Sequence, residues 1–330
     1  MTTERTPLKI PKAELHCHLE GAASPDLVRR LAKRNHLALP SSLFTEKNDF
    51  AWSDFVAFLK AYDVASSAIR TPEDYRDVTY EYLVASAAEG VIYTELMASP
   101  DHAAASGLGY DGMLEGIVAG INDARPYGIE GRIIMTCVRH LGSDRALGVA
   151  RQVAAGPHAY IVGFGMGGDE NKYRPADFQP AFQVAVDAGL SCTCHAGEVA
   201  GPESIRAALT HLPIKRVGHG VRAIDDPNLI VQLAEQGIVL EVCPTSNIAT
   251  GVFSSYAEHP LKALRDAGCA ITLNSDDPPY FKTTIGREYQ IAADHFGFDD
   301  IALRDITHTA IAESFADPEL KIRLLTRLNS

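Results

Sequence analysis

The sequence predicts an α/β protein with the architecture of a TIM-type (β/α)8 barrel. Four amphipathic helix patterns end in a glycine that an apolar strand pattern follows at once, at Gly90, Gly189, Gly237 and Gly268. Each glycine stands where a left-handed helix C-cap is expected. Eight apolar strand patterns occur in all, with helical patterns between most of them, so the strands should run parallel and be buried on both faces.

The eight strand patterns cover residues 13–19, 91–97, 132–138, 160–166, 190–196, 216–221, 238–243 and 270–275. Helix starts are marked by a capping side chain before a proline, as at Ser24-Pro25 and Asp226-Pro227. The periodicity also allows an open doubly wound sheet. The dinucleotide-binding version of that sheet has no support, because no Gly-x-Gly-x-x-Gly turn follows the first strand pattern.

One segment interrupts the alternation of helices and strands. We expect a single domain over residues 1–330, with an extra helical insertion over 40–75 after the first strand–helix unit. The insertion holds Trp52, the only tryptophan, and a stripe of large apolar residues at helical spacing from Phe55 to Tyr62. Such a stripe can pack against the side of the barrel or form a lid over the mouth of a pocket, and the two roles are compatible.

The charge and composition exclude several classes of partner. The chain has 30 basic and 42 acidic residues, a formal net charge of −12, whereas a nucleic-acid partner calls for a basic patch. It shows no Lys/Arg-rich run, no apolar run of membrane-spanning length and no signal-peptide pattern, so we expect a cytoplasmic protein without a membrane partner. The six cysteines should be buried and unpaired.

An unusual set of polar residues stands at the carboxyl ends of the strand patterns, where barrels of this kind carry their chemistry. The set comprises His16, His18 and Glu20 on the first strand, His195 and Glu198 on the fifth, His219 on the sixth, and Asp276 and Asp277 on the eighth. His16 and His18 are two residues apart and therefore share one face of their strand. Burying imidazoles and carboxylates together is costly, and a divalent cation would remove that cost.

The residue types favour one zinc ion, or a neighbouring metal, per subunit. Three imidazoles and one carboxylate suit zinc, which lowers the pKa of a bound water toward neutrality. A second metal would need another bridging ligand, often a lysine at the end of the fourth strand. Residues 160–166 contain no lysine.

The motifs that carry these residues are "PKAELHCHLEG", "HAGE", "RVGHG", "CPTSN" and "NSDDP". In this order and spacing they make the chain resemble the adenosine/adenine deaminase family of the metal-dependent amidohydrolase superfamily, over about residues 8–315. "HAGE", "SDDP" and the histidine pair together are highly specific, although any one of them alone would be a weak signal.

The resemblance implies a role for each residue. It implies the metal ligands His16, His18, His195 and Asp276, the substrate contacts Glu20, His18, Gly168 and Asp277, and the catalytic groups Glu198, His219 and Asp276. Glu198 would protonate N1 of a 6-aminopurine while metal-bound hydroxide, oriented by His219, attacks C6. Asp277 would bind N7, and the Gly168 N–H would lie opposite N3.

The implied reaction is hydrolytic deamination of adenosine or deoxyadenosine, giving inosine or its deoxy form plus ammonia. One departure favours free adenine as the alternative substrate. Glu20 stands where members that act on adenosine usually have an aspartate that touches the ribose, and its extra methylene would either intrude into the space of the sugar or reach a differently placed sugar. Less favoured alternatives are another amidohydrolase reaction and an inactive relative that binds purines or a partner protein. The oligomeric state stays open.

Three smaller features have their own interpretations. His102 follows a turn signal, and we expect it to cap that turn rather than to line the site. Arg139 and His140 end the third strand pattern and can lie behind the metal ligands. Cys192 and Cys194 alternate with His195 along the fifth strand, so they should face the core rather than the metal.

Overall fold

The computed structural model describes residues 9–330, so the first eight residues of the predicted domain lie outside the described part. The described chain forms one sheet of eight parallel strands in the order β1 to β8. The strands are β1 (Lys12–His18), β2 (Val91–Ala98), β3 (Glu130–Val138), β4 (Ile161–Gly167), β5 (Ser191–Ala196), β6 (Arg216–His219), β7 (Val239–Val242) and β8 (Ala270–Leu273). All eight predicted strands are therefore confirmed, and the parallel order confirms the (β/α)8 barrel.

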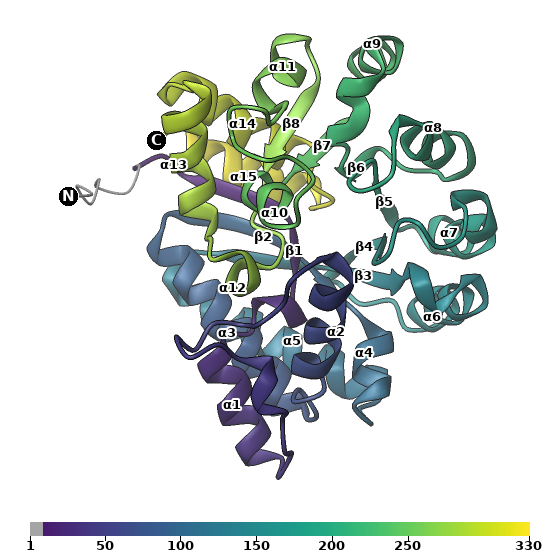
Figure 1. Ribbon diagram of the computed structural model, residues 1–330, viewed down its shortest axis with the longest axis vertical. Coiled ribbons are helices and arrows are strands. Elements are labelled where there is room, and N and C mark those ends of the chain that lie inside the picture. Colours follow the sequence, from purple (N-terminus) through teal and green to yellow (C-terminus); the bar gives the residue numbers. More distant parts are fainter. Residues whose placement is uncertain (1–8) are drawn as a thin grey trace.

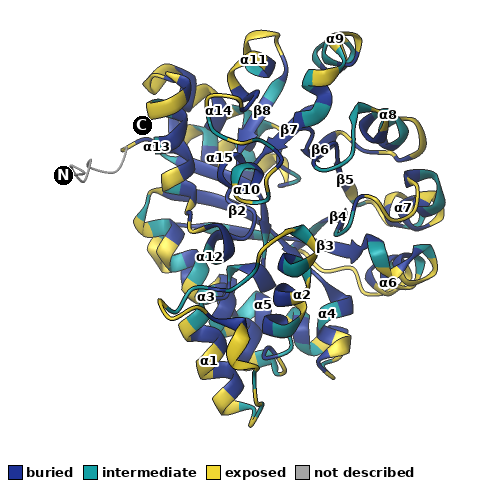
Figure 2. Ribbon diagram, viewed as in Figure 1, coloured by how far each residue is buried: buried dark blue, intermediate teal, exposed yellow. Residues whose placement is uncertain are grey.

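Helices surround the strands, most of them in an outer ring whose yellow outer faces contrast with the dark blue, buried strands, while α2, α10 and α12 lie nearer the centre of the view (Figures 1 and 2). The helices are α1 (Pro25–Arg34), α2 (Phe55–Ser66), α3 (Pro72–Ala88), α4 (Pro100–Ala105), α5 (Tyr110–Ala124), α6 (Ser143–Ala155), α7 (Gln179–Asp187), α8 (Pro202–His211), α9 (Pro227–Glu235), α10 (Pro244–Ala249), α11 (Leu261–Asp266), α12 (Pro278–Phe281), α13 (Ile285–Phe296), α14 (Asp300–Ala312) and α15 (Pro318–Leu328).

The helix boundaries follow the local signals of the sequence. The Asp226 carboxylate accepts hydrogen bonds from the N–H groups of Asn228 and Leu229 at the start of α9, which satisfies donors that lack a partner within the helix. Gly90 and Gly237 have φ angles of 85° and 62°, in the left-handed region that a side chain disfavours. Each glycine ends its helix and turns the chain directly into the next strand.

The barrel closes where β1 meets the end of β8. The His18 N–H donates to the Asp276 carbonyl at 2.9 Å, and the Asp276 N–H donates to the His16 carbonyl at 3.2 Å. The closure therefore places the predicted histidine pair directly beside the predicted aspartate ligand. Between β4 and β5, in contrast, the pairing stops at Phe164 and Cys192, short of the carboxyl end of β4.

The interior of the barrel below the strand ends is polar and ionic. Arg216 on β6 is 1% exposed and lies between two buried carboxylates, with its Nη2 2.7 Å from Glu95 and its Nε 2.6 Å from Glu241. Its guanidinium also lies 3.6 Å from the centre of the Phe315 ring, which closes this end of the barrel. Buried charges of this kind are tolerated only when they are paired.

The predicted insertion over residues 40–75 contains α2, which lies beside α12 near the centre of Figure 1. The ring centre of Trp52 lies 5.9 Å from that of Phe281, and Phe58 packs on the same ring at 5.1 Å. Phe58 and neighbouring residues of α2 also line the pocket at the strand ends. The insertion therefore packs on α12 and forms part of the pocket wall. Within residues 9–330, no helix is both long enough and apolar enough to cross a membrane.

Candidate functional site

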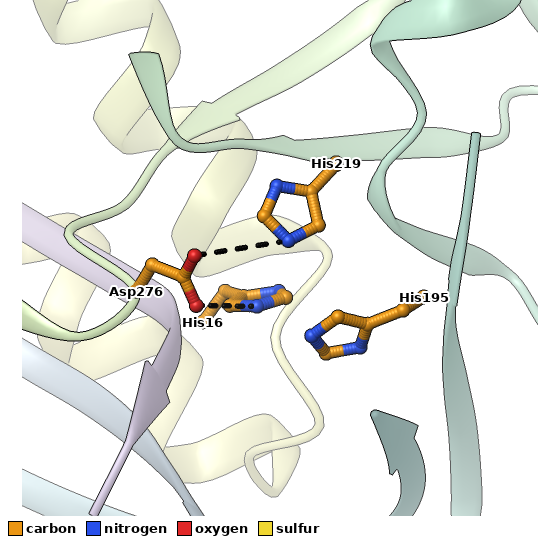
Figure 3. Close-up of side chains that lie close together, drawn as sticks. All are labelled: His16, His195, His219 and Asp276. Carbon is orange, nitrogen blue, oxygen red and sulfur yellow. Dashed lines mark ion pairs between the residues drawn. The ribbon is translucent and has the colours of Figure 1, made fainter. Parts of the chain in front are cut away.

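Four side chains from β1, β5 and the end of β8 converge on one point at the mouth of the barrel. The Nε2 atoms of His16 and His18 each lie 3.4 Å from Oδ1 of Asp276. The Nε2 atoms of His18 and His195 lie 3.1 Å apart. Figure 3 shows His16, His195, His219 and Asp276 pointing toward one another from separate strands. The structure therefore brings together all four predicted metal ligands.

The spacing and the packing of these atoms fit a metal ion. A tetrahedral ion with bonds of about 2.0–2.1 Å holds its ligand atoms about 3.3 Å apart, close to the separations seen here. Gly167 and Gly218 have no side chains, which leaves space for the imidazole rings. A Cβ atom on Gly167 would stand 3.2 Å from Cε1 of both His18 and His195, and one on Gly218 would stand 3.0 Å from Cε1 of His16. This His/Asp cluster could therefore hold a cation.

Most of these groups already have the protonation state that metal binding requires. Burial, followed by the neighbouring imidazoles, lowers the pKa of His195 well below its usual value, so that its ring is neutral. Burial alone would raise the pKa of Asp276, but the His16 hydrogen bond and the nearby imidazoles lower it overall. Burial lowers the pKa of His16, yet Asp276 and Glu241 outweigh that effect and raise it to about 10. The carboxylates around His16 thus favour a positive charge at this site, which a bound cation would supply.

Neighbouring side chains orient two of the predicted metal ligands, His16 and Asp276. The Nδ1 atom of His16 lies 2.9 Å from Oε2 of Glu241, which directs the other ring nitrogen toward the cluster. The Ser246 hydroxyl donates to Oδ2 of Asp276 at 2.6 Å and leaves Oδ1 for the cluster. Asp276 and His219 have φ angles of 64° and 60°, a left-handed conformation that is uncommon outside glycine. Such backbone geometry concentrates at functional sites.

His219 lies next to the cluster, with its ring centre 5.0 Å from that of His16 and 5.2 Å from that of His195. Its Nε2 atom is 3.8 Å from Oδ2 of Asp276 and 3.7 Å from Oε2 of Glu198. Its Nδ1 atom pairs with the Asn247 amide at 3.3 Å. A ligand atom of His219 lies within 4.8 Å of ligand atoms of His16, His195 and Asp276, so His219 borders the possible metal site as well as Glu198.

Burial sets the protonation of the two acids in the pocket. Burial first, and then the negative charges of Asp276 and Glu170, raise the pKa of Glu198 well above its usual value. Burial and the charge of Asp276 raise the pKa of Asp277 in the same way. At neutral pH both groups can therefore carry a proton and donate it to a bound molecule.

A pocket opens directly above these groups. It is lined by the predicted site residues His18, Gly168, His195, Glu198, His219, Asp276 and Asp277, by Phe55, Phe58, Leu59, Tyr62 and Asp63 of α2, and by residues that include Met97, Ser99, His102, Val138 and His140. Apolar side chains of the insertion face the acids and imidazoles across the cavity. A flat, partly polar molecule fits such surroundings.

The prediction that His102 only caps a turn was wrong. His102 lies in α4, lines the pocket, and pairs through Nε2 with Asp63 of α2 at 3.0 Å. The sequence could not show this pairing, because the insertion brings the partner from another part of the chain. His140 also lines the pocket, whereas Arg139 donates to the carbonyls of Lys172 and Tyr173. Cys192 and Cys194 are buried and unpaired, as predicted.

Glu20 lies behind the pocket wall and is not among the residues that line the cavity. It is 2% exposed, and its carboxylate accepts hydrogen bonds from the Tyr75 hydroxyl at 3.0 Å, the Ser99 N–H at 3.0 Å and the Tyr62 hydroxyl at 3.3 Å. Tyr62 and Ser99 themselves line the pocket. Glu20 therefore shapes the cavity through its neighbours.

Sequence reasoning missed the residues that support the ligands, above all Glu241 and Ser246. A signal for Glu241 is present, because "IVLEVC" places a single carboxylate in an otherwise apolar strand. A charge in such a position needs a buried partner. The partners, His16 and Arg216, cannot be named without the fold.

We expect Glu241→Gln to weaken metal binding by about 10- to 100-fold, the usual effect of removing a group that orients a metal ligand. The neutral amide can still contact Nδ1 of His16. It lacks the full negative charge that stabilises the proton on that nitrogen. Competition with a chromophoric chelator measures the affinity for zinc. Glu235→Gln, an exposed change on α9, is the matched control. Unchanged affinity in Glu241→Gln would remove Glu241 from the metal site.

Comparison with known proteins agrees with this geometry. A family model described as "Adenosine deaminase" matches residues 11–330. An adenine deaminase from Mesorhizobium japonicum is 47% identical over 319 residues, which cover 96% of this chain and 98% of that protein.

Solved structures give the same result. The crystal structure of an adenine deaminase from Arthrobacter aurescens has a TM-score of 0.91 and 30% identity, covering 97% of this chain and 98% of that one. An amidohydrolase from Burkholderia ambifaria, solved with bound Zn, has a TM-score of 0.88 and 27% identity, covering 99% of this chain and 94% of that one.

Proposed function

The chain belongs to the adenosine deaminase family, and we propose that this hydrolytic deaminase converts free adenine and water to hypoxanthine and ammonia with one zinc ion bound. The observation that carries the proposal is the convergence of four metal-ligating side chains beside the buried Glu198, whose pKa is raised, in one pocket. Of the two substrates that the motifs allow, the relatives support adenine better than adenosine. The M. japonicum and A. aurescens proteins are both named adenine deaminase.

In this proposal zinc is held by His16, His18, His195 and Asp276. The separations of 3.1–3.4 Å among their ligand atoms suit its tetrahedral preference. The B. ambifaria relative, which contains Zn, supports this choice of metal. Bound zinc lowers the pKa of a water molecule, so that a strong nucleophile is available near neutral pH.

Glu198 acts as the general acid. Its raised pKa keeps a proton on the carboxyl group, and it lies across the pocket from the apolar side chains of α2. Donation of that proton to N1 makes C6 a better electrophile and leaves the ring neutral after addition of the nucleophile. His219, between Glu198 and Asp276, orients the attacking water and stabilises the charge that develops on the attacking oxygen.

Two further groups fix the orientation of the purine in the pocket. Asp277 lines the pocket with a raised pKa, so its carboxyl group can donate a hydrogen bond to N7, which has no proton. Gly168 lines the same pocket at φ 99°, and its N–H lies opposite N3 in the proposed pose. His18 contributes through its place between the metal cluster and the cavity. These contacts recognise the ring nitrogens N7 and N3 of a 6-aminopurine.

The wall formed by Glu20 and α2 favours a base over a nucleoside. A ribose would need acceptors for its hydroxyl groups, but the Glu20 carboxylate is already occupied by Tyr62, Tyr75 and Ser99. The neighbouring lining residues Phe55, Phe58 and Leu59 offer no hydrogen-bonding groups. A sugar placed against these three side chains would lose hydrogen bonds to water without replacing them.

We expect kcat/KM for adenine to exceed that for adenosine by about 10²-fold, because burying the hydroxyl groups of a ribose beside apolar side chains costs free energy. The loss of absorbance as the 6-aminopurine becomes a 6-oxopurine measures the rates. Adenosine, deoxyadenosine and N6-methyladenine are compared with adenine on protein of known zinc content. Equal rates on adenosine would overturn the choice of adenine. Fully zinc-loaded protein that deaminates none of them would overturn the proposed function.

A further inference from the structure

Glu170, in the loop after β4, is a buried carboxylate to which the proposed reaction assigns no step. It is 3% exposed. Its Oε2 atom accepts hydrogen bonds of 3.0 Å from the backbone N–H groups of Glu198, Val199 and Ala200. Its Oε1 atom accepts from the Gly197 N–H and from the Ser204 hydroxyl. Four consecutive N–H groups therefore point at one carboxylate.

This arrangement is a backbone concavity built around an anion. Successive N–H groups turn inward together only when the chain takes an unusual path, and Gly197 supplies it with a φ of 70°. The carbonyl side of the same segment is held separately, because the Arg222 N–H donates to the Gly197 carbonyl at 2.9 Å. The two sets of bonds fix the main chain at Glu198 from both sides.

The main chain at this point decides where the general acid lies. Glu198 is three residues beyond His195, after β5 has ended at Ala196, so strand pairing no longer constrains it. Its carboxylate must reach the purine ring while it stays 3.7 Å from His219. Small errors in the position of a catalytic group cost large factors in rate.

We propose that Glu170 is a positioning residue that acts through Glu198, by holding the N–H groups of residues 197–200 around its carboxylate. The inference rests on the proposed function. Glu170 also belongs to the loop that carries Gly168, so one segment contacts the purine and supports the acid that protonates it. The negative charge of Glu170 contributes to the raised pKa of Glu198, which agrees with this role.

The first test is Glu170→Gln, which replaces one of the two acceptor oxygens by an amide donor that faces other donors. We expect kcat to fall about 10- to 100-fold with KM nearly unchanged and zinc content still one per chain. Amide hydrogen exchange of residues 197–200, followed by mass spectrometry, should become faster. Asp169→Asn makes the same chemical change one residue away, where the carboxylate accepts a hydrogen bond from the Asn171 N–H, and should keep kcat within about twofold.

The deciding test combines this variant with Glu198→Gln. If Glu170 acts through Glu198, Glu170→Gln should lower the residual rate of the Glu198→Gln protein by less than about threefold. If the rate of the double variant falls by the product of the two single-variant factors, the proposal is overturned. If Glu170→Gln does not fold, Glu170→Asp, which keeps the charge but shortens the reach, enters the same cycle.

Failure of the proposed function would be visible separately. Wild-type protein that releases no ammonia from adenine overturns that function. Amide exchange at residues 197–200 needs no substrate, and unchanged exchange in folded Glu170→Gln would overturn the positioning role by itself.

Discussion

Glu198→Gln is expected to lower kcat for adenine by about 10³-fold while the protein keeps its zinc and still binds purine. General acid catalysis is worth about 10²–10⁴-fold, and the amide cannot give up a proton at neutral pH. Glu198 is not one of the four converging ligands, so the metal content should not change. The measurements are the rate of ammonia release, metal analysis, and the binding of hypoxanthine.

Two observations would contradict this result. Activity close to that of the wild type would remove Glu198 from the mechanism. Loss of zinc together with the activity would show that Glu198 supports the metal site rather than protonating the substrate. Glu203→Gln, an exposed change at the start of α8, is the matched control and should leave the rate within about twofold.

His195→Ala should have the largest effect, a loss of bound metal and a fall in the rate of at least about 10³-fold, because the metal provides the nucleophile. His195 supplies one of the three imidazole nitrogens of the cluster and lies 3.1 Å from the nitrogen of His18. Removing the ring leaves a gap in a buried set of charged groups. Zinc content below about a tenth per chain, measured on folded protein, is the expected outcome.

Circular dichroism and thermal unfolding show whether the His195→Ala protein is folded. His211→Ala changes an exposed histidine at the end of α8 and should retain both zinc and activity. A folded His195→Ala protein with one zinc per chain and full activity would contradict both the ligand set and the proposed reaction.

Much of this site could be predicted because its residues stand at repeated positions in local patterns. His16 and His18 share a face of β1 since side chains alternate along a strand, and His195 and Asp276 stand at the ends of other apolar segments. The ends of parallel strands meet at one mouth of a barrel. From these two rules the predicted ligands should converge, and the structure places His16 and His18 3.4 Å from Asp276 and His18 3.1 Å from His195.

The supporting residues show where such reasoning ends. Glu170 and Glu241 each bind groups that lie 27 or more residues away along the chain, Gly197 and His16 respectively. The residues next to Glu170 and Glu241 in the sequence do not indicate these partners. His102 was misplaced for the same reason, because its partner Asp63 comes from the insertion.

The amino-acid sequence by itself determined the eight strands, the helix caps, the ligand residue types and the resemblance that goes with them. These depend on periodicity and on short-range sterics, which a few neighbouring residues set. The tertiary structure alone decided that Glu20 lies behind Tyr62 and Ser99 and that four N–H groups surround Glu170. Those contacts arise only when the barrel closes and buried polar groups must find partners, wherever in the chain these occur.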